Sequence, residues 1–246
     1  MRNDNRVTPI ERLLVHLPGA SVGHAQHVAV WAGKPPKPFK RFYVYQETSD
    51  GRLWLTKVAT GGDALLTNEA RALVWLADRL RATDLAATVP RAVRSHDNML
   101  VVEWVSARSL VEGILRARRW APARGYLAAR CAAVVGWLAR FHQLTGRGAG
   151  VGAIHGDFRP TNILIGAQDE LIVVDWELFS PEALQVFDLL HFATHVGLGC
   201  IGGDIAHGMQ WGLLKPTWVS ELVNTLIKQY FHQMGRRPDD LVAVYH

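Results

Sequence analysis

The residues with the clearest chemical potential lie in one segment, HGDFRPTNILIGAQDELIVVDWE, at positions 155–177. Asp157 is followed five residues later by Asn162, and Asp175 closes the apolar run LIVVD. Phosphoryl transfer needs a carboxylate that orients an attacking hydroxyl and hard oxygen ligands that hold magnesium on the phosphates. These three side chains have the types for both tasks. The alternative for each acid alone is a turn or capping residue. At average residue frequencies, however, the triplet HGD followed by this Asn and this second Asp occurs by chance in roughly a few in 100,000 such chains.

This segment resembles the catalytic loop and metal-binding motif of the aminoglycoside phosphotransferase and choline kinase superfamily, whose members are relatives of the protein kinases. The resemblance covers about residues 40–195 and is strongest at 155–177. It implies that Asp157 is the catalytic base and that Asn162 and Asp175 bind magnesium. It also implies a bilobal protein-kinase-like fold that uses ATP and Mg²⁺.

Two positions depart from the family pattern. Residue 159 is Arg, where these small-molecule kinases often carry His and protein kinases carry Lys. A cation two residues after the base could lie on the transferring phosphate, so Arg159 is a candidate catalytic residue, with a surface Arg as the alternative. The metal motif reads Asp175-Trp176-Glu177 instead of Asp-Phe-Gly. Glu177 could approach a second metal or the substrate, or form a peripheral ion pair.

The family also places nucleotide-binding residues upstream. A strand Lys holds the α- and β-phosphates and a helix Glu holds that Lys. Lys57 and Glu69, twelve residues later, have this order, with an exposed strand Lys as the alternative for Lys57. The run MLVVEWVSARSL resembles the hinge, which implies that backbone groups from Glu103 to Val105 meet the adenine edge. An ordinary buried strand explains its apolar residues equally well.

Several other patterns are weaker. The turn GKPPKPFKR (33–41) lacks G-x-G-x-x-G, and a solvated basic turn explains it better than a phosphate-covering loop. GLGCIG (197–202) fits a dinucleotide-binding pattern, but the preceding FDLLHFATHV is helical in pattern and not a strand. His191 and His195 are four residues apart without the Glu of a zinc protease, so we interpret them as core or surface histidines. Asp188 matches a family position that braces the catalytic loop.

The elements that must position these residues change character along the chain. Asp50-Gly51 predicts a hairpin turn, and from Thr67, a predicted N-cap, a helix follows with Val74 and Leu76 on its apolar stripe. Strands are predicted at 27–33, 41–46, 52–59, 99–105, 162–166 and 171–175, and helices at 109–119, 126–143 and beyond 181. This order predicts an α+β chain. A small antiparallel-sheet, nucleotide-binding lobe is expected at 1–105 and a larger, mainly helical catalytic and acceptor-binding lobe at 106–246.

The amino-acid composition limits the classes of protein to which the chain can belong. The 246 residues are 49% hydrophobic and 20% charged, which suffices to bury a core. Net charge is +5, and the Arg-rich stretch 108–140 is interpreted as a solvated helix face because no nucleic-acid motif accompanies it. The polar start and two Cys without paired spacing favour a reducing compartment. We therefore expect a cytoplasmic protein with no nucleic-acid partner and no membrane span.

The sequence thus predicts a phosphotransferase that moves the γ-phosphoryl group of ATP to a hydroxyl of a small-molecule acceptor, such as a sugar, an amino alcohol or an antibiotic-like compound. A non-catalytic nucleotide-binding pseudokinase is one alternative, because the glycine loop is missing. A protein kinase is a second, although only Ser180-Pro181-Glu182 approaches the A-P-E motif. A dinucleotide oxidoreductase rests on GLGCIG alone. The choice between ATP and GTP and the oligomeric state stay open.

The acidic and aromatic residues of the C-terminal third indicate which class of acceptor the protein could bind. A polycationic aminoglycoside would need several carboxylates, and the acids from Ser180 onward are few: Glu182, Asp188, Asp204, Glu221, Asp239 and Asp240. The aromatics of this region are expected in the core, with a cage around one quaternary or ring-shaped group as the alternative: Phe192, Trp211, Trp218, Tyr230 and Phe231. The final LVAVYH looks like the start of another helix, so the chain is expected to continue beyond residue 246.

Overall fold

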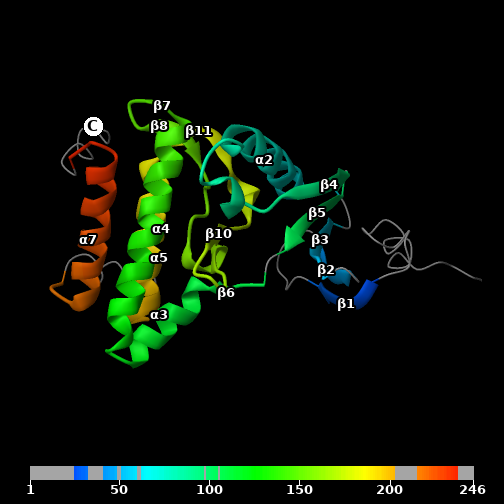
Figure 1. Ribbon diagram of the computed structural model, residues 1–246. Coiled ribbons are helices and arrows are strands. Elements are labelled where there is room, and N and C mark those ends of the chain that lie inside the picture. The colour runs from blue at the N-terminus through cyan, green and yellow to red at the C-terminus, as the bar shows by residue number, and fades with distance from the viewer. Residues whose placement is uncertain are drawn as a thin grey trace, which may run out of the picture. The chain divides into compact units, whose positions relative to one another are not determined.

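The computed structural model describes residues 25–32, 41–48, 51–59, 62–96, 98–104, 106–202 and 215–237. These residues form five α-helices and small antiparallel sheets, so the predicted α+β class is confirmed (Figure 1). The chain divides into two compact units. Unit 1 comprises Met1–Arg71 and Pro90–Ser106, and unit 2 comprises Ala72–Val89 and Ala107–His246.

Unit 1 contains one five-stranded antiparallel sheet in the order β1-β2-β3-β5-β4. Its strands are β1 (Ala25–Ala32), β2 (Arg41–Thr48), β3 (Leu53–Ala59), β4 (Ala92–His96) and β5 (Met99–Trp104). Four of them fall close to the predicted ranges. β4, with the sequence AVRSH, was not predicted because it lacks a run of β-branched residues, and its pairing with the apolar β5 makes it a strand.

Lys57 occupies the central strand of this sheet. It lies on β3 opposite Tyr43 of β2 and Leu100 of β5, so its backbone is held on both sides. The neighbouring Thr56 and Val58 are buried on the other face, as the alternation of side chains along a strand requires. The position of Lys57 is therefore fixed by the sheet and not by a loop.

Helix α2 (Ala64–Leu80) begins three residues before the predicted N-cap, Thr67. Asp63 caps it instead, because Asp63 Oδ1 accepts hydrogen bonds from the backbone N–H groups of Leu65 at 3.0 Å and Leu66 at 3.2 Å. Thr67 lies inside the helix and donates its hydroxyl to the Asp63 carbonyl. Val74 was predicted on the buried stripe but is 65% exposed, whereas Leu76 is buried.

Asp63 also forms a buried ion pair with Arg41, the first residue of β2. Arg41 Nη2 donates to Asp63 Oδ1 at 2.9 Å and Arg41 Nε donates to Oδ2, and both side chains are almost fully buried. The hydrogen bond from Arg41 holds the pKa of Asp63 below its ordinary value, against the effect of burial. One carboxylate thus ties the start of β2 to the start of α2.

Asp63→Ala is therefore expected to destabilise the protein by about 3 kcal/mol, because the substitution removes a helix cap and leaves a buried guanidinium without its carboxylate. The free energy of unfolding in urea measures this. Asp78→Ala on the same helix is the matched control, since the side chains of its pair with Arg81 are 80% and 77% exposed, and no change is expected there. Equal stability of the two variants would contradict the bracing role of Asp63.

Besides the C-terminal part of α2, the described residues of unit 2 form four helices, two three-stranded sheets and three short 3-10 helices. The helices are α3 (Leu110–Arg119), α4 (Ala123–Thr145), α5 (Val186–Ile201) and α7 (Trp218–Gln233). One sheet has the order β10-β9-β6, formed by β6 (Arg108–Ser109), β9 (Ile163–Ile165) and β10 (Leu171–Val173). The other has the order β11-β8-β7, formed by β7 (Gly146–Gly148), β8 (Val151–Ile154) and β11 (Ser180–Leu184). The 3-10 helices are η2 (Ala86–Thr88), η3 (Pro160–Asn162) and η4 (Trp176–Leu178).

The helices of unit 2 enclose its core. α7 packs against both α4 and α5, and α3 packs against the same two helices (Figure 1). None of the described helices is long and apolar enough to cross a membrane.

Two segments differ from the sequence-based expectations. Residues beyond 181 were predicted to be helical, but β11 extends to Leu184 because it pairs with β8, and α5 begins only at Val186. The GLGCIG pattern lies mostly within α5, which ends at Ile201. It therefore does not form the strand-to-helix turn that binds a dinucleotide, which argues against the oxidoreductase alternative.

An aromatic cluster in unit 2 holds the segment that carries the predicted chemistry. Phe158 and Trp176, which directly follow Asp157 and Asp175, are fully buried. The ring of Phe158 stacks on Trp137 of α4 with centroids 5.7 Å apart, and Trp176 meets Phe141 of α4 edge-on at 5.6 Å. Aromatic burial next to each candidate acid therefore anchors both acids to the same helix.

Candidate active site

Asp188 of α5 holds the backbone of the candidate catalytic loop. Its Oδ2 accepts a hydrogen bond from the His155 N–H at 2.6 Å, and its Oδ1 accepts one from the Gly156 N–H at 3.0 Å. Asp188 is fully buried, so these bonds compensate for the desolvation of its charge. The predicted bracing contact of Asp188 is confirmed.

Two residues from other helices surround this brace. His142 of α4 places Nε2 3.6 Å from Asp188 Oδ2, and its Nδ1 lies 2.6 Å from the hydroxyl of Tyr230 on α7. Burial lowers the pKa of His142, which favours the neutral ring. A neutral His142 with its proton on Nε2 accepts a hydrogen bond from the Tyr230 hydroxyl at Nδ1 and directs an N–H towards Asp188. The brace is thus supported from α4 and α7 as well as α5.

Gly156 must be glycine. Its φ is +82°, and a Cβ at this position would clash with the carbonyl group of Leu178. The middle residue of the HGD triplet therefore permits the close approach of the loop to the segment that follows Asp175.

His155 joins the two halves of the site. Its Nε2 donates to the Val174 carbonyl at 2.9 Å, and its Nδ1 accepts from the Asp157 N–H at 3.2 Å, a pattern that requires the neutral ring. Burial lowers the pKa of His155, in agreement with this form. A backbone hydrogen bond of 2.9 Å from Val174 N–H to the Asn162 carbonyl adds a second link. Asp157, Asn162 and the end of β10 are therefore held together.

The carboxylate of Asp157 has three side-chain partners. Oδ2 accepts from Asn162 Nδ2 at 3.0 Å and pairs with Arg159 Nη2 at 3.0 Å. Oδ1 lies 3.1 Å from Nε2 of His191, a residue of α5. Burial acts to raise the pKa of Asp157, but the hydrogen bonds from His191 and Asn162 and the charge of Arg159 lower it overall. Asp157 is therefore an ionised, oriented carboxylate at neutral pH.

Asn162 is oriented by the same carboxylate group. Its Nδ2 donates both to the Asp157 carbonyl at 2.9 Å and to Asp157 Oδ2, which uses both amide hydrogens. The amide oxygen Oδ1 consequently points the other way, where it accepts from the Thr161 hydroxyl at 3.3 Å. Asn162 thus offers an oxygen of the kind that a hard cation prefers.

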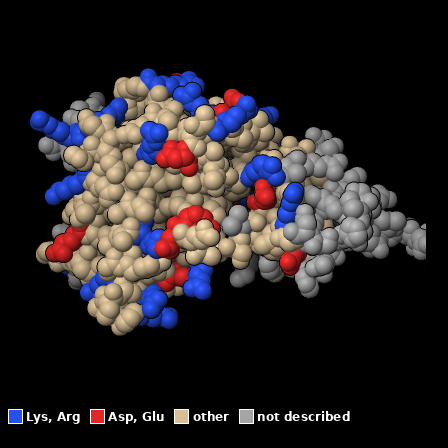
Figure 2. Space-filling model, in the orientation of Figure 1, with Lys and Arg blue, Asp and Glu red and all other residues tan. Residues whose placement is uncertain are grey.

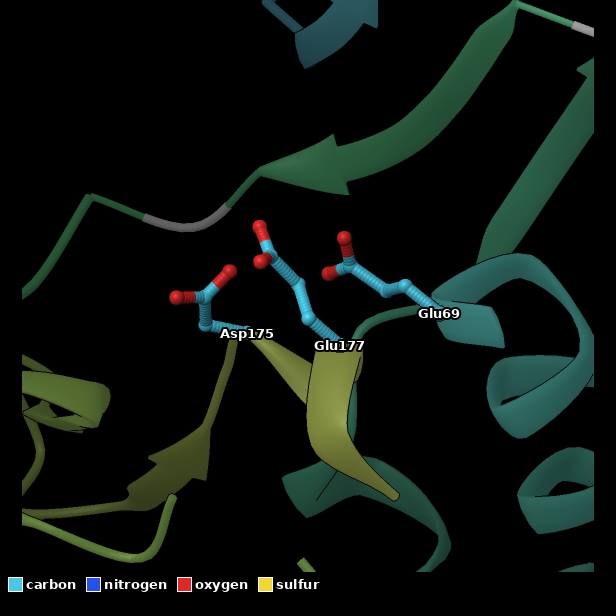
Figure 3. A group of neighbouring side chains, drawn as sticks. All are labelled: Glu69, Asp175 and Glu177. Atoms are coloured by element: carbon cyan, nitrogen blue, oxygen red, sulfur yellow. The ribbon is translucent and has the colours of Figure 1, made fainter. Parts of the chain in front are cut away.

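Asp175 and Glu177 extend their carboxylates to the same side of the segment after β10 (Figure 3). An oxygen of each lies within 4.8 Å of an oxygen of the other. Asp175 has the left-handed backbone conformation, with φ of 68° and ψ of 58°, which is uncommon outside glycine and Asn or Asp. The two neighbouring carboxylates of Asp175 and Glu177 are oxygen donors of the kind that Mg²⁺ prefers.

Lys57 and Glu69 are brought together in unit 1. Nζ of Lys57 lies 2.8 Å from both carboxylate oxygens of Glu69, which projects from α2 (Figure 3). The two side chains are 8% and 3% exposed, so the pair is buried. The alternative of an exposed strand Lys is wrong for Lys57.

Of the two predicted hinge residues, only Glu103 belongs to the part of the chain that the structure describes. Glu103 lies on β5, where its N–H donates to the Arg91 carbonyl at 3.0 Å and its partly exposed side chain accepts from Arg91 Nε at 3.2 Å. The N–H of Glu103 is therefore used inside unit 1. Val105 lies outside the described residues.

Sequence reasoning missed two residues of the site. His155 is part of HGD, and its role as a clamp follows from its place in that triplet. His191 was interpreted as an ordinary core or surface histidine, yet it contacts Asp157. The available signal was its position three residues after Asp188, which puts both on one face of α5.

The sequence matches no known protein-family profile and no curated protein. The solved structures that are similar to the chain include two macrolide 2'-phosphotransferases. A type I macrolide 2'-phosphotransferase has a TM-score of 0.43 and 13% identity, with 93% of this chain and 90% of that chain covered. Macrolide 2'-phosphotransferase MphH from Brachybacterium faecium has a TM-score of 0.43 and 15% identity, with 85% of this chain and 87% of that chain covered. At these values neither similarity assigns an activity to this chain.

Proposed function

We propose that the protein is a small-molecule kinase, which transfers the γ-phosphoryl group of ATP to a hydroxyl of an acceptor. The observation that supports this most directly is the arrangement of Asp157, whose ionised carboxylate is held by Asn162, Arg159 and His191. The hydrogen bonds that tie its loop to the end of β10 keep Asp175 close by. This is what in-line transfer to a hydroxyl requires: a fixed base beside oxygen ligands for a metal.

The proposed reaction is a displacement at the γ-phosphorus of ATP. The acceptor hydroxyl oxygen forms a bond to the γ-phosphorus, the bond from that phosphorus to the bridging oxygen breaks, and ADP leaves. Asp157 accepts the hydroxyl proton and later releases it to water. Arg159 is the candidate for stabilising charge on the transferring group, because its guanidinium already reaches Asp157 Oδ2 and has further N–H donors.

Magnesium would be held by Asn162 and Asp175, with Glu177 as a further oxygen donor. When bound, the ion supplies positive charge that neutralises the phosphate oxygens. The chain's own contribution is to fix the ligands: the amide of Asn162 is oriented by Asp157, and Asp175 is set by its left-handed turn.

The lobe at 1–105 is the proposed nucleotide-binding part and 106–246 the proposed catalytic lobe; unit 1 differs from the first of these ranges because Ala72–Val89 belong to unit 2. Lys57 would bind the α- and β-phosphates while Glu69 keeps its ammonium in place. The Glu103 N–H donates to the Arg91 carbonyl. We therefore propose that Val105 and backbone carbonyl groups of this segment bind the adenine edge.

The acceptor is proposed to be a hydroxylated small molecule and not a polycationic aminoglycoside. Of the acids after Ser180, Asp188 is buried under the catalytic loop and Glu182 pairs with Arg147 at 2.8 Å. On the face drawn in Figure 2, basic and acidic side chains are interspersed, and no large acidic patch is seen. Phe192, Tyr230 and Phe231 are buried in the core and do not offer a cage for a quaternary group.

A phosphate-transfer screen tests the proposal. The purified protein is incubated with magnesium and γ-labelled ATP or GTP, together with sugars, amino alcohols, nucleosides, macrolides or aminoglycosides. We expect labelled product from at least one non-aminoglycoside acceptor, and no labelled product from a Lys57→Met variant. Tight ATP binding without transfer to any compound would favour the pseudokinase alternative. Preferred phosphorylation of an aminoglycoside would refute the proposed acceptor class.

A further inference from the structure

Helix α5 reaches the candidate catalytic loop at two points. Asp188 accepts hydrogen bonds from the loop backbone at His155 and Gly156, and His191, one turn later, reaches the side chain of Asp157. Residues three apart lie on one face of a helix. The helix that fixes where the loop runs therefore also contacts the carboxylate that the loop carries.

The imidazole of His191 is itself held on both sides. The ring of Phe187 lies nearly parallel to it, with 5.6 Å between centroids and 17° between planes. The ring of His195 lies on the next turn, with centroids 4.3 Å apart, and its Nδ1 contacts the His191 carbonyl at 2.9 Å. The side chain of His191 is only 25% exposed. These contacts restrict the ring to an orientation that points Nε2 at Asp157.

The hydrogen bonds of Asp157 are unevenly divided between its two oxygens. An ionised carboxylate has about four lone-pair positions. Within the described part of the chain, Oδ2 takes two side-chain partners, Asn162 and Arg159, whereas Oδ1 takes only His191. The remaining acceptor position is therefore on Oδ1, beside the imidazole. Because a carboxylate oxygen can only accept, His191 must carry its proton on Nε2.

We propose that His191 is a positioning residue for Asp157, which fixes Oδ1 so that its remaining lone pair meets the acceptor hydroxyl. This role rests on the proposed function of Asp157 as the base. Asn162 and Arg159 belong to the same loop as Asp157 and move with it, whereas His191 ties the carboxylate to a packed helix. Without His191, the carboxylate can rotate about its side-chain bonds, and small errors in the position of a base cost much of the rate.

Three variants of His191 separate this role from packing. Gln can place an amide N–H near the position of Nε2, Asn is polar but too short, and Leu has no donor. With Mg-ATP and the best acceptor of the screen, we expect His191→Leu and His191→Asn to lower kcat by about 10–100-fold, while KM for ATP changes less than about threefold. His191→Gln should recover most of the loss. His232→Leu makes the same change at an exposed histidine of α7, away from the candidate base, so it is the matched control and should leave kcat unchanged.

A second readout does not depend on turnover. Ring ¹⁵N resonances of histidine report the tautomer and hydrogen bonding of each nitrogen. The His191 signals are identified by their loss in His191→Gln, and Asp157→Asn should shift the Nε2 signal of His191 in protein without any ligand. Thermal melting checks that each variant folds, and His191→Asn replaces His191→Leu if the latter does not.

The outcomes are distinguishable. A wild-type protein that transfers no phosphate contradicts the proposed function, and the ring signals then decide the contact between His191 and Asp157 by themselves. Any of three results would overturn the positioning role. The first is an unchanged kcat in both folded His191→Leu and His191→Asn, and the second is an equal loss of kcat in His191→Gln and His191→Leu. The third is a His191 ring signal that is the same in Asp157→Asn as in the wild type.

Discussion

Asp157→Asn is expected to lower kcat by about 10²–10⁴-fold, because an amide cannot take the proton of the attacking hydroxyl. The affinity for ATP should stay within about threefold, since the base acts mainly in the transition state. Rapid-quench measurement of phosphate transfer and a nucleotide titration on the same preparation test both expectations. Arg159 and Asn162 still find an oxygen acceptor if the new amide turns its carbonyl towards them.

Asp169→Asn is the matched control for this substitution. Asp169 lies in the turn between β9 and β10, 61% exposed, where it pairs with Arg130. The same chemical change is made there in the same unit, away from the candidate base, and kcat should be unaffected. A wild-type rate in Asp157→Asn would remove Asp157 as the base, and an equal loss in both variants would point to a general effect on folding.

The parts of the site that could be predicted are those whose partners are close in sequence. Asp157 and Asn162 lie five residues apart in one loop, so one motif contained both, and the structure joins them by two hydrogen bonds. Lys57 and Glu69 are separated only by the end of a strand and the first turns of a helix. In each case the local structure leaves few other arrangements, and the residue types indicated that structure.

The parts that could not be predicted depend on distant partners. Helix α2 starts at Ala64 and not near Thr67, because Asp63 is both a cap and the partner of Arg41, 22 residues earlier. β11 is a strand because β8 pairs with it, although its own sequence, SPEAL, has little strand character. The contact of His191 with Asp157 spans 34 residues. Such pairings depend on how the elements pack, which no local pattern records.

Arg159 illustrates how a residue type can be predicted while its contact is not. The sequence placed a cation two residues after the base and assigned it to the phosphate. In the structure the guanidinium pairs with Asp157 and remains 41% exposed at its side chain. Because the guanidinium has five N–H donors, one contact with Asp157 leaves others for a phosphoryl group. The same pairing also contributes to keeping Asp157 ionised.

Asp175→Asn is expected to lower the magnesium-dependent tightening of ATP binding by about 10–100-fold, because the cation loses one of its anionic ligands. Asn tolerates the left-handed conformation at residue 175, so the loss reports charge and not backbone strain. Asp169→Asn is again the matched control, because Asp169 also has a positive φ, of 66°. Calorimetric titration of ATP with excess magnesium and with a chelator gives the ratio of affinities for each protein. We expect a ratio near one in Asp175→Asn and a wild-type ratio in Asp169→Asn, and a wild-type ratio in both would exclude Asp175 as the metal ligand.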